Sequence, residues 1–279
     1  MMQGQATVAQ NQPYILGHTD TELDRLIKQS QFYGDLTTNV LHLAGLKPGM
    51  QALDIGCGAG DVSFLAAKLV GPEGKVVGVD KSPEALALAA RRASSARLMN
   101  VQFMNFDLLE LSLAEPVDAL IGRLVLMYFP DPAAMLRRLL NFVKPGGIVA
   151  FQEMDMDASK SEPACELFET SLWRIKQTFT RADVDIRTSL RLGRIFEEAG
   201  LPAPQMIGGT RVESGPDSPA YEQVTEITRT LLPLMERTGV ATAEEVGIET
   251  LAARLREETV TRNATLVSPA MIGAWAQKV

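Results

Sequence analysis

The stretch Leu53-Asp54-Ile55-Gly56-Cys57-Gly58-Ala59-Gly60 places three glycines at alternate positions, between an apolar run over residues 50–55 and a predicted helix over residues 61–70. A strand that turns sharply into a helix needs residues without a Cβ, because side chains would collide with the turn or with a ligand. The helix directs unpaired N–H groups and a partial positive charge back at the loop. The spacing differs from the Gly-x-Gly-x-x-Gly of dinucleotide-binding domains. The sequence therefore predicts a strand, a ligand-holding loop and a helix, without the dinucleotide signature.

Two acidic residues, Asp80 and Asp107, come at the ends of the next two apolar runs. Ligands of open parallel sheets lie beyond the carboxyl ends of the strands. There Asp80 can accept hydrogen bonds from the hydroxyls of a ribose. Asp107 can accept one from an adenine amino group while Phe106 or Leu108 packs on the ring. The alternatives are a helix N-cap or a solvated strand end for Asp80, and a cap of the following segment for Asp107.

Strands and helices alternate through the first half of the chain. Further apolar runs cover residues 117–121, just before Arg123, and residues 148–151, while helices are predicted over residues 83–98 and 131–143. Such alternation is typical of a parallel sheet with right-handed crossovers.

In this order and at this spacing, the motifs resemble those of class I methyltransferases that use S-adenosylmethionine. The resemblance covers about residues 30 to 211 and is greatest to the ubiquinone/menaquinone-type and natural-product small-molecule branch. It implies a Rossmann-like α/β fold with a seven-stranded, mostly parallel sheet and an antiparallel last strand. It also implies S-adenosylmethionine as the cofactor, lying across the first three strands.

The resemblance further implies which residues bind the cofactor. The backbone of Gly56, Gly58 and Gly60 would hold its methionine part, and Asp54 would reach its ammonium group. Arg123 would bind the cofactor carboxylate or an anionic substrate, with a plain surface salt bridge as the alternative. Cys57 is expected as a small residue that the loop tolerates, not as a nucleophile. The full predicted cofactor set is Tyr33, Asp54, Gly56, Cys57, Gly58, Gly60, Asp80, Lys81, Phe106, Asp107, Leu108 and Arg123.

Methyl transfer from a sulfonium needs mainly orientation and exclusion of water, and it needs a general base only when the acceptor carries a proton to remove. The candidates for such a base are His18, Glu153 and Asp155. His42 is expected in a packed or surface role, because it lies among apolar residues of the N-terminal helix. The acids over residues 153–157 are interpreted as a solvated strand end, and no metal ion is expected.

Composition excludes several classes of protein. The chain has 279 residues, of which 46% are hydrophobic, and a net charge of −7. An acidic chain does not carry the basic surface that tracks nucleic-acid phosphates. The two cysteines are far apart and predict neither a disulfide framework nor a zinc site. No signal peptide or membrane span is predicted, so a cytoplasmic protein is expected.

The acceptor is expected to be a small and fairly apolar molecule, methylated on oxygen or, failing that, on carbon or nitrogen. Residues 122–125 read Gly-Arg-Leu-Val. In the resembling class, enzymes that methylate amino groups of adenine or glutamine carry Asn/Asp-Pro-Pro-Tyr at this place. The sequence therefore argues against nucleic-acid and protein amide targets.

The domain organisation is predicted from periodicity and from a departure from the minimal family pattern. Gly34 is a candidate break in the N-terminal helical segment. A helix is predicted over residues 188–199, ending at Gly200, and the sixth strand over residues 204–212. About fifty residues, with a helix predicted over 243–259, separate it from the seventh strand, predicted over 264–275, and long insertions are usually functional. We expect a lid or pocket wall there, with an oligomer contact or extra core packing as alternatives and a homodimer through the helical insertions. The predicted parts are a disordered tail over residues 1–13, an N-terminal helical cap over 14–46, a core over 47–157 and 188–279, and helical lid insertions over 158–187 and 214–262.

Two other functions remain as hypotheses. One is a module that binds S-adenosylmethionine without transferring its methyl group, either to activate a partner or to support a rearrangement. The other is a nicotinamide-dependent oxidoreductase, which the glycine spacing and Asp107 count against.

Overall fold

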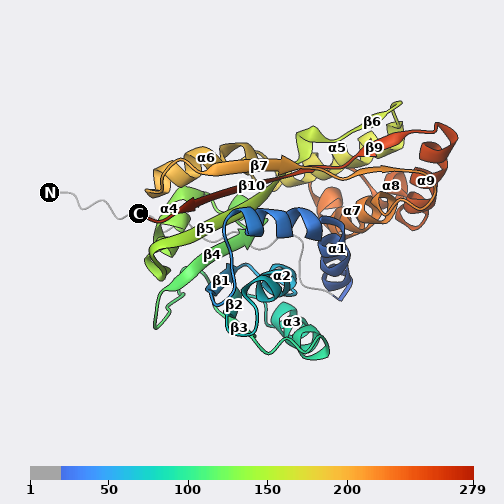
Figure 1. Ribbon diagram of the computed structural model, residues 1–279. Coiled ribbons are helices and arrows are strands. Elements are labelled where there is room, and N and C mark those ends of the chain that lie inside the picture. Colours follow the sequence, from blue (N-terminus) through green and yellow to red (C-terminus); the bar gives the residue numbers. More distant parts are fainter. Residues whose placement is uncertain (1–19) are drawn as a thin grey trace.

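The computed structural model describes the backbone of residues 20–279 and the side chains of residues 32–279. The tail predicted over residues 1–13 and the base candidate His18 lie outside these residues. Figure 1 shows a central sheet with helices on both faces and a helical lobe beyond one end of the sheet.

The central sheet has seven strands in the order β3-β2-β1-β4-β5-β10-β7. The first five of these pair in parallel, whereas β10 runs antiparallel to both of its neighbours. The predicted Rossmann-like sheet with an antiparallel last strand is confirmed. The strands are β1 (Gln51–Ile55), β2 (Lys75–Asp80), β3 (Val101–Asn105), β4 (Val117–Arg123), β5 (Val143–Asp155), β7 (Gln205–Gly209) and β10 (Ala270–Gln277).

The strand order reverses between β1 and β4. From β1 the chain first builds outward through β2 and β3, and then returns to place β4 on the other side of β1. The register aligns Ile55 of β1 with Val79 of β2 and with Gly122 of β4, so the three strands end at one level. A crevice at such a switch point is where open α/β sheets bind ligands.

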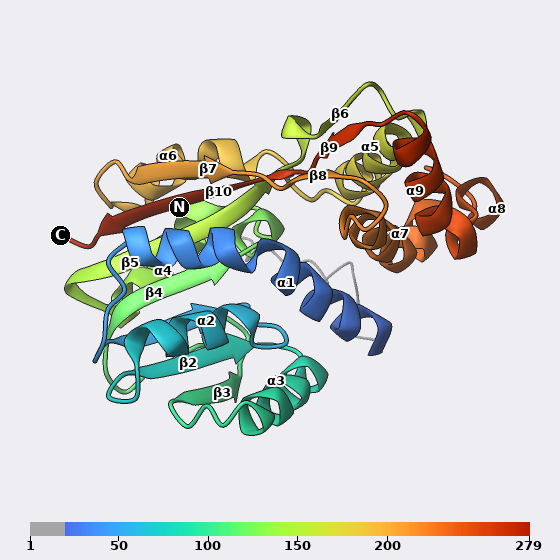
Figure 2. The same cartoon turned by 45° about the vertical axis from the view of Figure 1, so that its right-hand side comes forward.

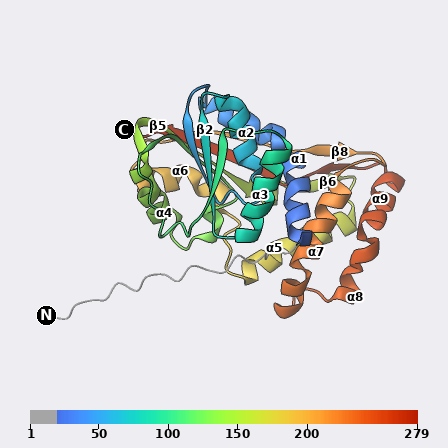
Figure 3. The same cartoon turned by 90° about the horizontal axis from the view of Figure 1, so that it is seen from below.

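Helices cover both faces of the sheet, each over its own hydrophobic core (Figure 3). On one face α1 (Asp20–Leu43) and α2 (Asp61–Val70) pack over the small apolar side chains of β1, β2 and β4. On the other face α4 (Pro132–Leu139) and α6 (Thr188–Ala199) pack against larger side chains such as Leu53 and Phe151. The helix α3 (Pro83–Ser95) begins at Pro83 after the N-cap Ser82, which accepts a hydrogen bond from the Ala85 N–H.

A helical lobe extends beyond the ends of β5 and β10 (Figure 2). A third hydrophobic core joins the helices of the lobe to the middle of α1 through Phe32 and Tyr33. A small sheet in the order β6-β9-β8 ties the lobe to the central sheet. The lobe consists of α5 (Glu166–Arg181), α7 (Ala220–Arg237), α8 (Ala243–Val246) and α9 (Leu251–Thr261), with β6 (Lys160–Glu162), β8 (Val212–Ser214) and β9 (Thr265–Val267).

Three segments differ from the sequence prediction. The strand predicted over residues 264–275 is two strands, β9 and β10, because the chain changes sheets between them. The helix predicted over residues 243–259 is also two, since Gly247 adopts a left-handed conformation that ends α8. Gly34, expected to break the N-terminal helix, lies inside the continuous helix α1.

Candidate active site

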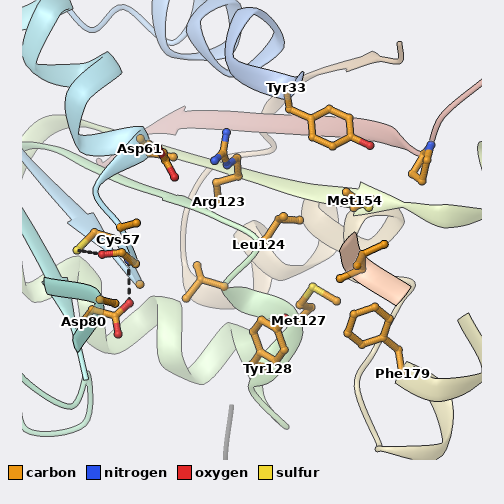
Figure 4. A pocket seen from close by; sticks show the side chains of 18 of the residues that line it. Tyr33, Cys57, Asp61, Asp80, Arg123, Leu124, Met127, Tyr128, Met154 and Phe179 are labelled. Carbon is orange, nitrogen blue, oxygen red and sulfur yellow. Dashed lines mark hydrogen bonds between the residues drawn. The ribbon is translucent and has the colours of Figure 1, made fainter. Parts of the chain in front are cut away.

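A large cavity lies at the carboxyl ends of β1, β2 and β4 and continues toward α5 and α7 (Figure 4). Its two halves differ in chemistry. One half, called here the cofactor half, is lined by strand ends and loops: Gly56, Cys57, Gly58, Ala59, Asp61, Val62, Asp80, Lys81, Ala85, Phe106, Asp107, Leu108 and Arg123. The other, called the apolar half, is lined by Tyr33, Leu124, Val125, Met127, Tyr128, Phe129, Met154, Met156, Leu172, Ile175, Phe179, Ile186, Ala220, Gln223, Val224, Ile227, Ser268 and Pro269.

The glycine loop is held open by backbone geometry that a side chain would disturb. Gly56, Gly58 and Gly60 all have positive φ, at 61°, 51° and 87°. A Cβ built on Gly56 would lie 2.8 Å from the Cγ2 of Val125. Such φ values are strained for residues with a Cβ. Gly56 therefore lets the loop approach Val125, in the segment that follows β4, more closely than a residue with a side chain would.

Asp80 fixes the same loop from the next strand. Its Oδ2 accepts a hydrogen bond from the Gly58 N–H at 2.9 Å, and its Oδ1 accepts one from the Ser82 N–H, also at 2.9 Å. Each carboxylate oxygen can accept a second hydrogen bond. Asp80 is therefore both the anchor of the glycine loop and a free acceptor at the cavity wall, and the sequence reading of it as a plain solvated strand end is wrong.

Asp54 lies buried beneath the loop with one oxygen unused. Its Oδ2 accepts a hydrogen bond from the Ser63 hydroxyl at 2.6 Å, whereas its Oδ1 has no partner among the described residues. Burial raises the pKa of Asp54 to about 7, although Ser63 and Arg123 favour its charged form. An unpartnered buried carboxylate oxygen gains from a cation placed beside it. Asp54 does not line the cavity, so its effect on a cationic ligand group there is one of charge from beneath the loop.

Cys57 has the inert character that the sequence predicted. It is buried, and burial together with the carboxylates of Asp54 and Asp80 raises the pKa of its thiol well above the ordinary value. A thiol held in its neutral form is a poor nucleophile.

The predicted adenine residues line the outer part of the cofactor half. Phe106 is 38% exposed, so a large part of its ring is open to contact. Asp107 accepts a hydrogen bond from the Leu109 N–H at 2.9 Å, so it also caps the following turn, which was the alternative reading. Leu108 is buried beside it and Lys81 is exposed at the rim.

Arg123 lies at the boundary between the two halves and is not part of a surface salt bridge. Its Nη1 donates to the Thr37 hydroxyl at 3.0 Å, and that hydroxyl donates to Gln152 Oε1 at 2.8 Å. Burial lowers the pKa of Arg123. Among the residues with described side chains no carboxylate is within 4.0 Å of its guanidinium, because Asp61 pairs with Arg92 at 2.6 Å. Arg123 thus keeps donors available for an anion in the cavity.

The two base candidates on β5 do not line the cavity. Glu153 is buried, and its Oε1 accepts hydrogen bonds from the N–H groups of Val125 at 3.1 Å and Leu126 at 2.8 Å. Asp155 accepts one from the Asp157 N–H at 3.0 Å and caps the next turn. Glu153 therefore positions the segment after β4, which contributes Met127 and Tyr128 to the apolar half.

Apart from Tyr33 and Tyr128, the residues of the apolar half are those that sequence reasoning missed. Met154 of β5 and Met156, the first residue after the strand, alternate with Glu153 and Asp155 and line the cavity, whereas the two acids do not. On α7 the lining residues recur at helical spacing, from Ala220 to Ile227. Both periodic signals were present in the sequence, but neither says which face meets the cavity.

The remaining features concern aromatic residues, His42, metal ions and membrane spans. Tyr33 and Tyr128 line the cavity, whereas Trp173 is 50% exposed outside it. His42 is exposed on α1, as expected. In the part of the chain that the structure describes, no group of acids, histidines and cysteines could hold a metal ion, and no helix is long and apolar enough to cross a membrane.

Comparison with known proteins agrees with this site. A model of the methyltransferase domain matches residues 46–200, which is more than half of the 279 residues. The chain therefore belongs to the class I methyltransferases, whose methyl donor is S-adenosylmethionine. The match covers every predicted cofactor residue except Tyr33.

A curated relative agrees with this family. A 2-phytyl-1,4-naphtoquinone methyltransferase of Synechococcus elongatus is 37% identical over 110 residues, which is 39% of this chain and 47% of the relative. The chain spans about half the length of the curated relatives it matches.

Two solved structures share the fold. A putative methyltransferase of Bacillus halodurans aligns with a TM-score of 0.57 and 17% identity, covering 88% of this chain and 99% of that one. The [4+2]-cyclase SpnF aligns with a TM-score of 0.52 and 20% identity, covering 89% and 81%. The fold by itself therefore does not define the reaction.

We expect the stability of the protein to fall as the pH rises from about 5 to about 8. Burial raises the pKa of Glu153 from 4.5 to about 8, so the folded state binds a proton that the unfolded chain has released over this range. Asp54, raised from 3.8 to about 7, acts in the same direction. Stability from a raised pKa is complete below the unfolded value and is lost as the pH passes the folded value.

Urea denaturation at a series of pH values measures this slope, which for one fully coupled group is about 1.4 kcal/mol per pH unit. Glu153→Gln should flatten the dependence, since the amide keeps an oxygen for the Val125 and Leu126 N–H groups but cannot ionise. Asp155→Asn, two residues along the same strand, is the matched control and should leave the slope in place. A variant Glu153→Gln with the wild-type slope would contradict the account.

Proposed function

We propose that this protein transfers a methyl group from S-adenosylmethionine to a small, largely apolar molecule, with oxygen as the favoured acceptor atom. The observation that supports this most strongly is the division of one cavity into a polar half at the switch point and an apolar half under the helical lobe. A carboxylate-rich wall and an apolar wall in one cavity fit two different molecules.

The residues of the cofactor half fit the donor. Bound there, S-adenosylmethionine would supply a methyl group already activated on a sulfonium. The buried carboxylate of Asp54, beneath the glycine loop, favours a cation such as an ammonium group above it, and the guanidinium of Arg123 has donors for a carboxylate. Asp80 offers its remaining acceptor capacity to the ribose, and Phe106 and Asp107 lie where the adenine is expected.

The apolar half indicates the kind of acceptor. Among the described residues that line it, none is an acid, a lysine, an arginine or a histidine. No described side chain at this wall is therefore a candidate general base, which favours an acceptor oxygen acidic enough to lose its proton to water. Phenol, enol and quinol hydroxyls meet this condition. The name of the Synechococcus relative points to a naphthoquinone ring system, which an apolar cavity also suits.

The helical lobe acts in this proposal as the acceptor wall and the barrier to water. Leu172, Ile175 and Phe179 of α5 and Val224 and Ile227 of α7 line the apolar half. Orientation of two reactants in a dry cavity is the main contribution that a protein makes to such a transfer. The homodimer through the helical insertions and the cytoplasmic location stay predictions from the sequence.

The test is transfer of a labelled methyl group. The protein is incubated with S-adenosylmethionine carrying tritium in its methyl group and with a panel of phenols, enols and reduced naphthoquinones. Label that moves into an organic extract with at least one acceptor, and not without it, supports the proposal. Tight binding of S-adenosylhomocysteine with no transfer to any acceptor would favour the alternative, a binding module without methyl transfer.

A further inference from the structure

Two hydroxyl groups in the apolar half, those of Tyr33 and Ser268, have no hydrogen-bond partner among the residues that the structure describes. The side chains are almost completely buried, at 2% and 4% exposure, and both line the cavity. Neither hydroxyl bonds to another described residue. Neither oxygen belongs to the sealed, unpartnered atoms of the interior, such as Asp54 Oδ1 and Ser189 Oγ. Both oxygens therefore reach the cavity.

Other buried hydroxyls of the lobe show that the lack of a partner is unusual in this fold. Tyr221 donates to the Gly215 carbonyl at 2.6 Å, and Ser171 donates to the Leu167 carbonyl at 2.7 Å. Buried polar groups are nearly always hydrogen-bonded, and one without a partner costs folding free energy. The hydroxyls of Tyr33 and Ser268 thus retain a capacity that the protein itself does not use.

The orientation of Tyr33 indicates what it faces. Figure 4 shows its ring extending from α1 beyond Arg123 toward Met154, with the hydroxyl at the leading end and away from Cys57 and Asp80. Burial raises the pKa of Tyr33 far above its ordinary value, so the phenol remains a neutral donor. The sequence placed Tyr33 among the cofactor residues, but its hydroxyl points into the apolar half.

We propose that the hydroxyls of Tyr33 and Ser268 each offer a hydrogen bond to an uncharged oxygen of the methyl acceptor, remote from the oxygen that is methylated. This rests on the proposed function and narrows its substrate class to apolar molecules with two oxygen functions, one near Arg123 and one, a hydroxyl or carbonyl, deeper in the apolar half. Met154, Phe179 and Ile227 pack on the intervening carbon skeleton. A fixed charge is excluded at the deep position, because no described ionisable side chain other than tyrosine lines that half to compensate it.

Probe binding tests the proposal without knowledge of the natural acceptor. Nile red is bound in the cavity of the protein with and without S-adenosylhomocysteine, and is displaced by 2-naphthol or by naphthalene at pH 7. The wild type should bind 2-naphthol at least about fivefold more tightly than naphthalene, the gain expected from one hydrogen bond. The double variant Tyr33→Phe, Ser268→Ala should lose this preference, while its affinity for S-adenosylhomocysteine in calorimetry stays unchanged.

Tyr221→Phe and Ser171→Ala are the matched controls, because their hydroxyls are equally buried but already partnered. They should lower the melting temperature and keep the naphthol preference. Tyr33→Phe should not lower the melting temperature, since it removes no hydrogen bond of the free protein.

Three outcomes would overturn the proposal. They are a naphthol preference that survives in the double variant, the absence of any preference in the wild type, and a Tyr33→Phe variant that loses affinity for S-adenosylhomocysteine alone. Failure of the wild type to bind S-adenosylhomocysteine would instead contradict the proposed function, and the displacement series without that ligand would still decide the role of the two hydroxyls.

Discussion

Asp80→Ala is expected to weaken the binding of S-adenosylhomocysteine by at least about tenfold while the protein stays folded. The Asp80 carboxylate has two roles at the cavity wall, and the alanine variant removes both. It is the expected acceptor for the ribose hydroxyls, and its two oxygens hold the N–H groups of Gly58 and Ser82 at 2.9 Å. Loss of the first contact removes a charged hydrogen bond, and loss of the second releases the glycine loop.

Titration calorimetry measures the affinity, and circular dichroism checks the fold. Asp80→Asn keeps one acceptor oxygen and should fall between the wild type and the alanine variant. Asp118→Ala is the matched control, because Asp118 also accepts from a backbone N–H, that of Gln51 at 2.8 Å, but at the opposite ends of the strands. It should leave the affinity unchanged. An unaltered affinity in Asp80→Ala would mean that the ribose is bound elsewhere.

Ile227→Trp is expected to reduce methyl transfer by about a hundredfold or more, because the indole fills the space in which the acceptor must align with the donor. Ile227 is only partly buried and lines the apolar half from α7, so the larger ring can enter the cavity without displacing the core. The cofactor half is left intact. Binding of S-adenosylhomocysteine should therefore stay within about twofold of the wild type.

Transfer of tritium to the best acceptor of the panel measures this effect, with calorimetry for the cofactor. Leu234→Trp is the control, since Leu234 lies on the same helix with similar burial but outside the cavity. Transfer that continues at the wild-type rate in Ile227→Trp would place the acceptor elsewhere. An equal loss of cofactor binding would show that the two halves are not separate sites.

The cofactor half could be predicted from sequence because its residues are local to strand ends. Once one strand ends just before Gly56, the next at Asp80 and the third two residues before Asp107, the parallel register alone brings those ends to one edge. Short-range sequence patterns also predicted α6 correctly. The helix covers Thr188–Ala199 as expected and ends at Gly200 in the left-handed conformation. Such features depend on short stretches of chain.

The apolar half could not be predicted because it is formed by tertiary packing. Its wall combines α1, β5, α5, α7 and the link between β9 and β10, which are far apart in the sequence. At the end of β5, Glu153 and Asp155 alternate with Met154 and with Met156, the first residue after the strand, and sequence reasoning favoured the acids because they can carry protons. The structure instead directs the methionines into the cavity and uses Glu153 to hold the segment after β4.

The central claim is that the cavity at the switch point takes S-adenosylmethionine. The most direct measurement is the shift in melting temperature of the purified protein with S-adenosylhomocysteine and, separately, with NAD⁺, each at a large excess over the protein. A ligand that binds only the folded state raises the melting temperature by mass action. The account predicts stabilisation by S-adenosylhomocysteine, reduced in Asp80→Ala, and none by NAD⁺. Stabilisation by NAD⁺ without stabilisation by S-adenosylhomocysteine would contradict it.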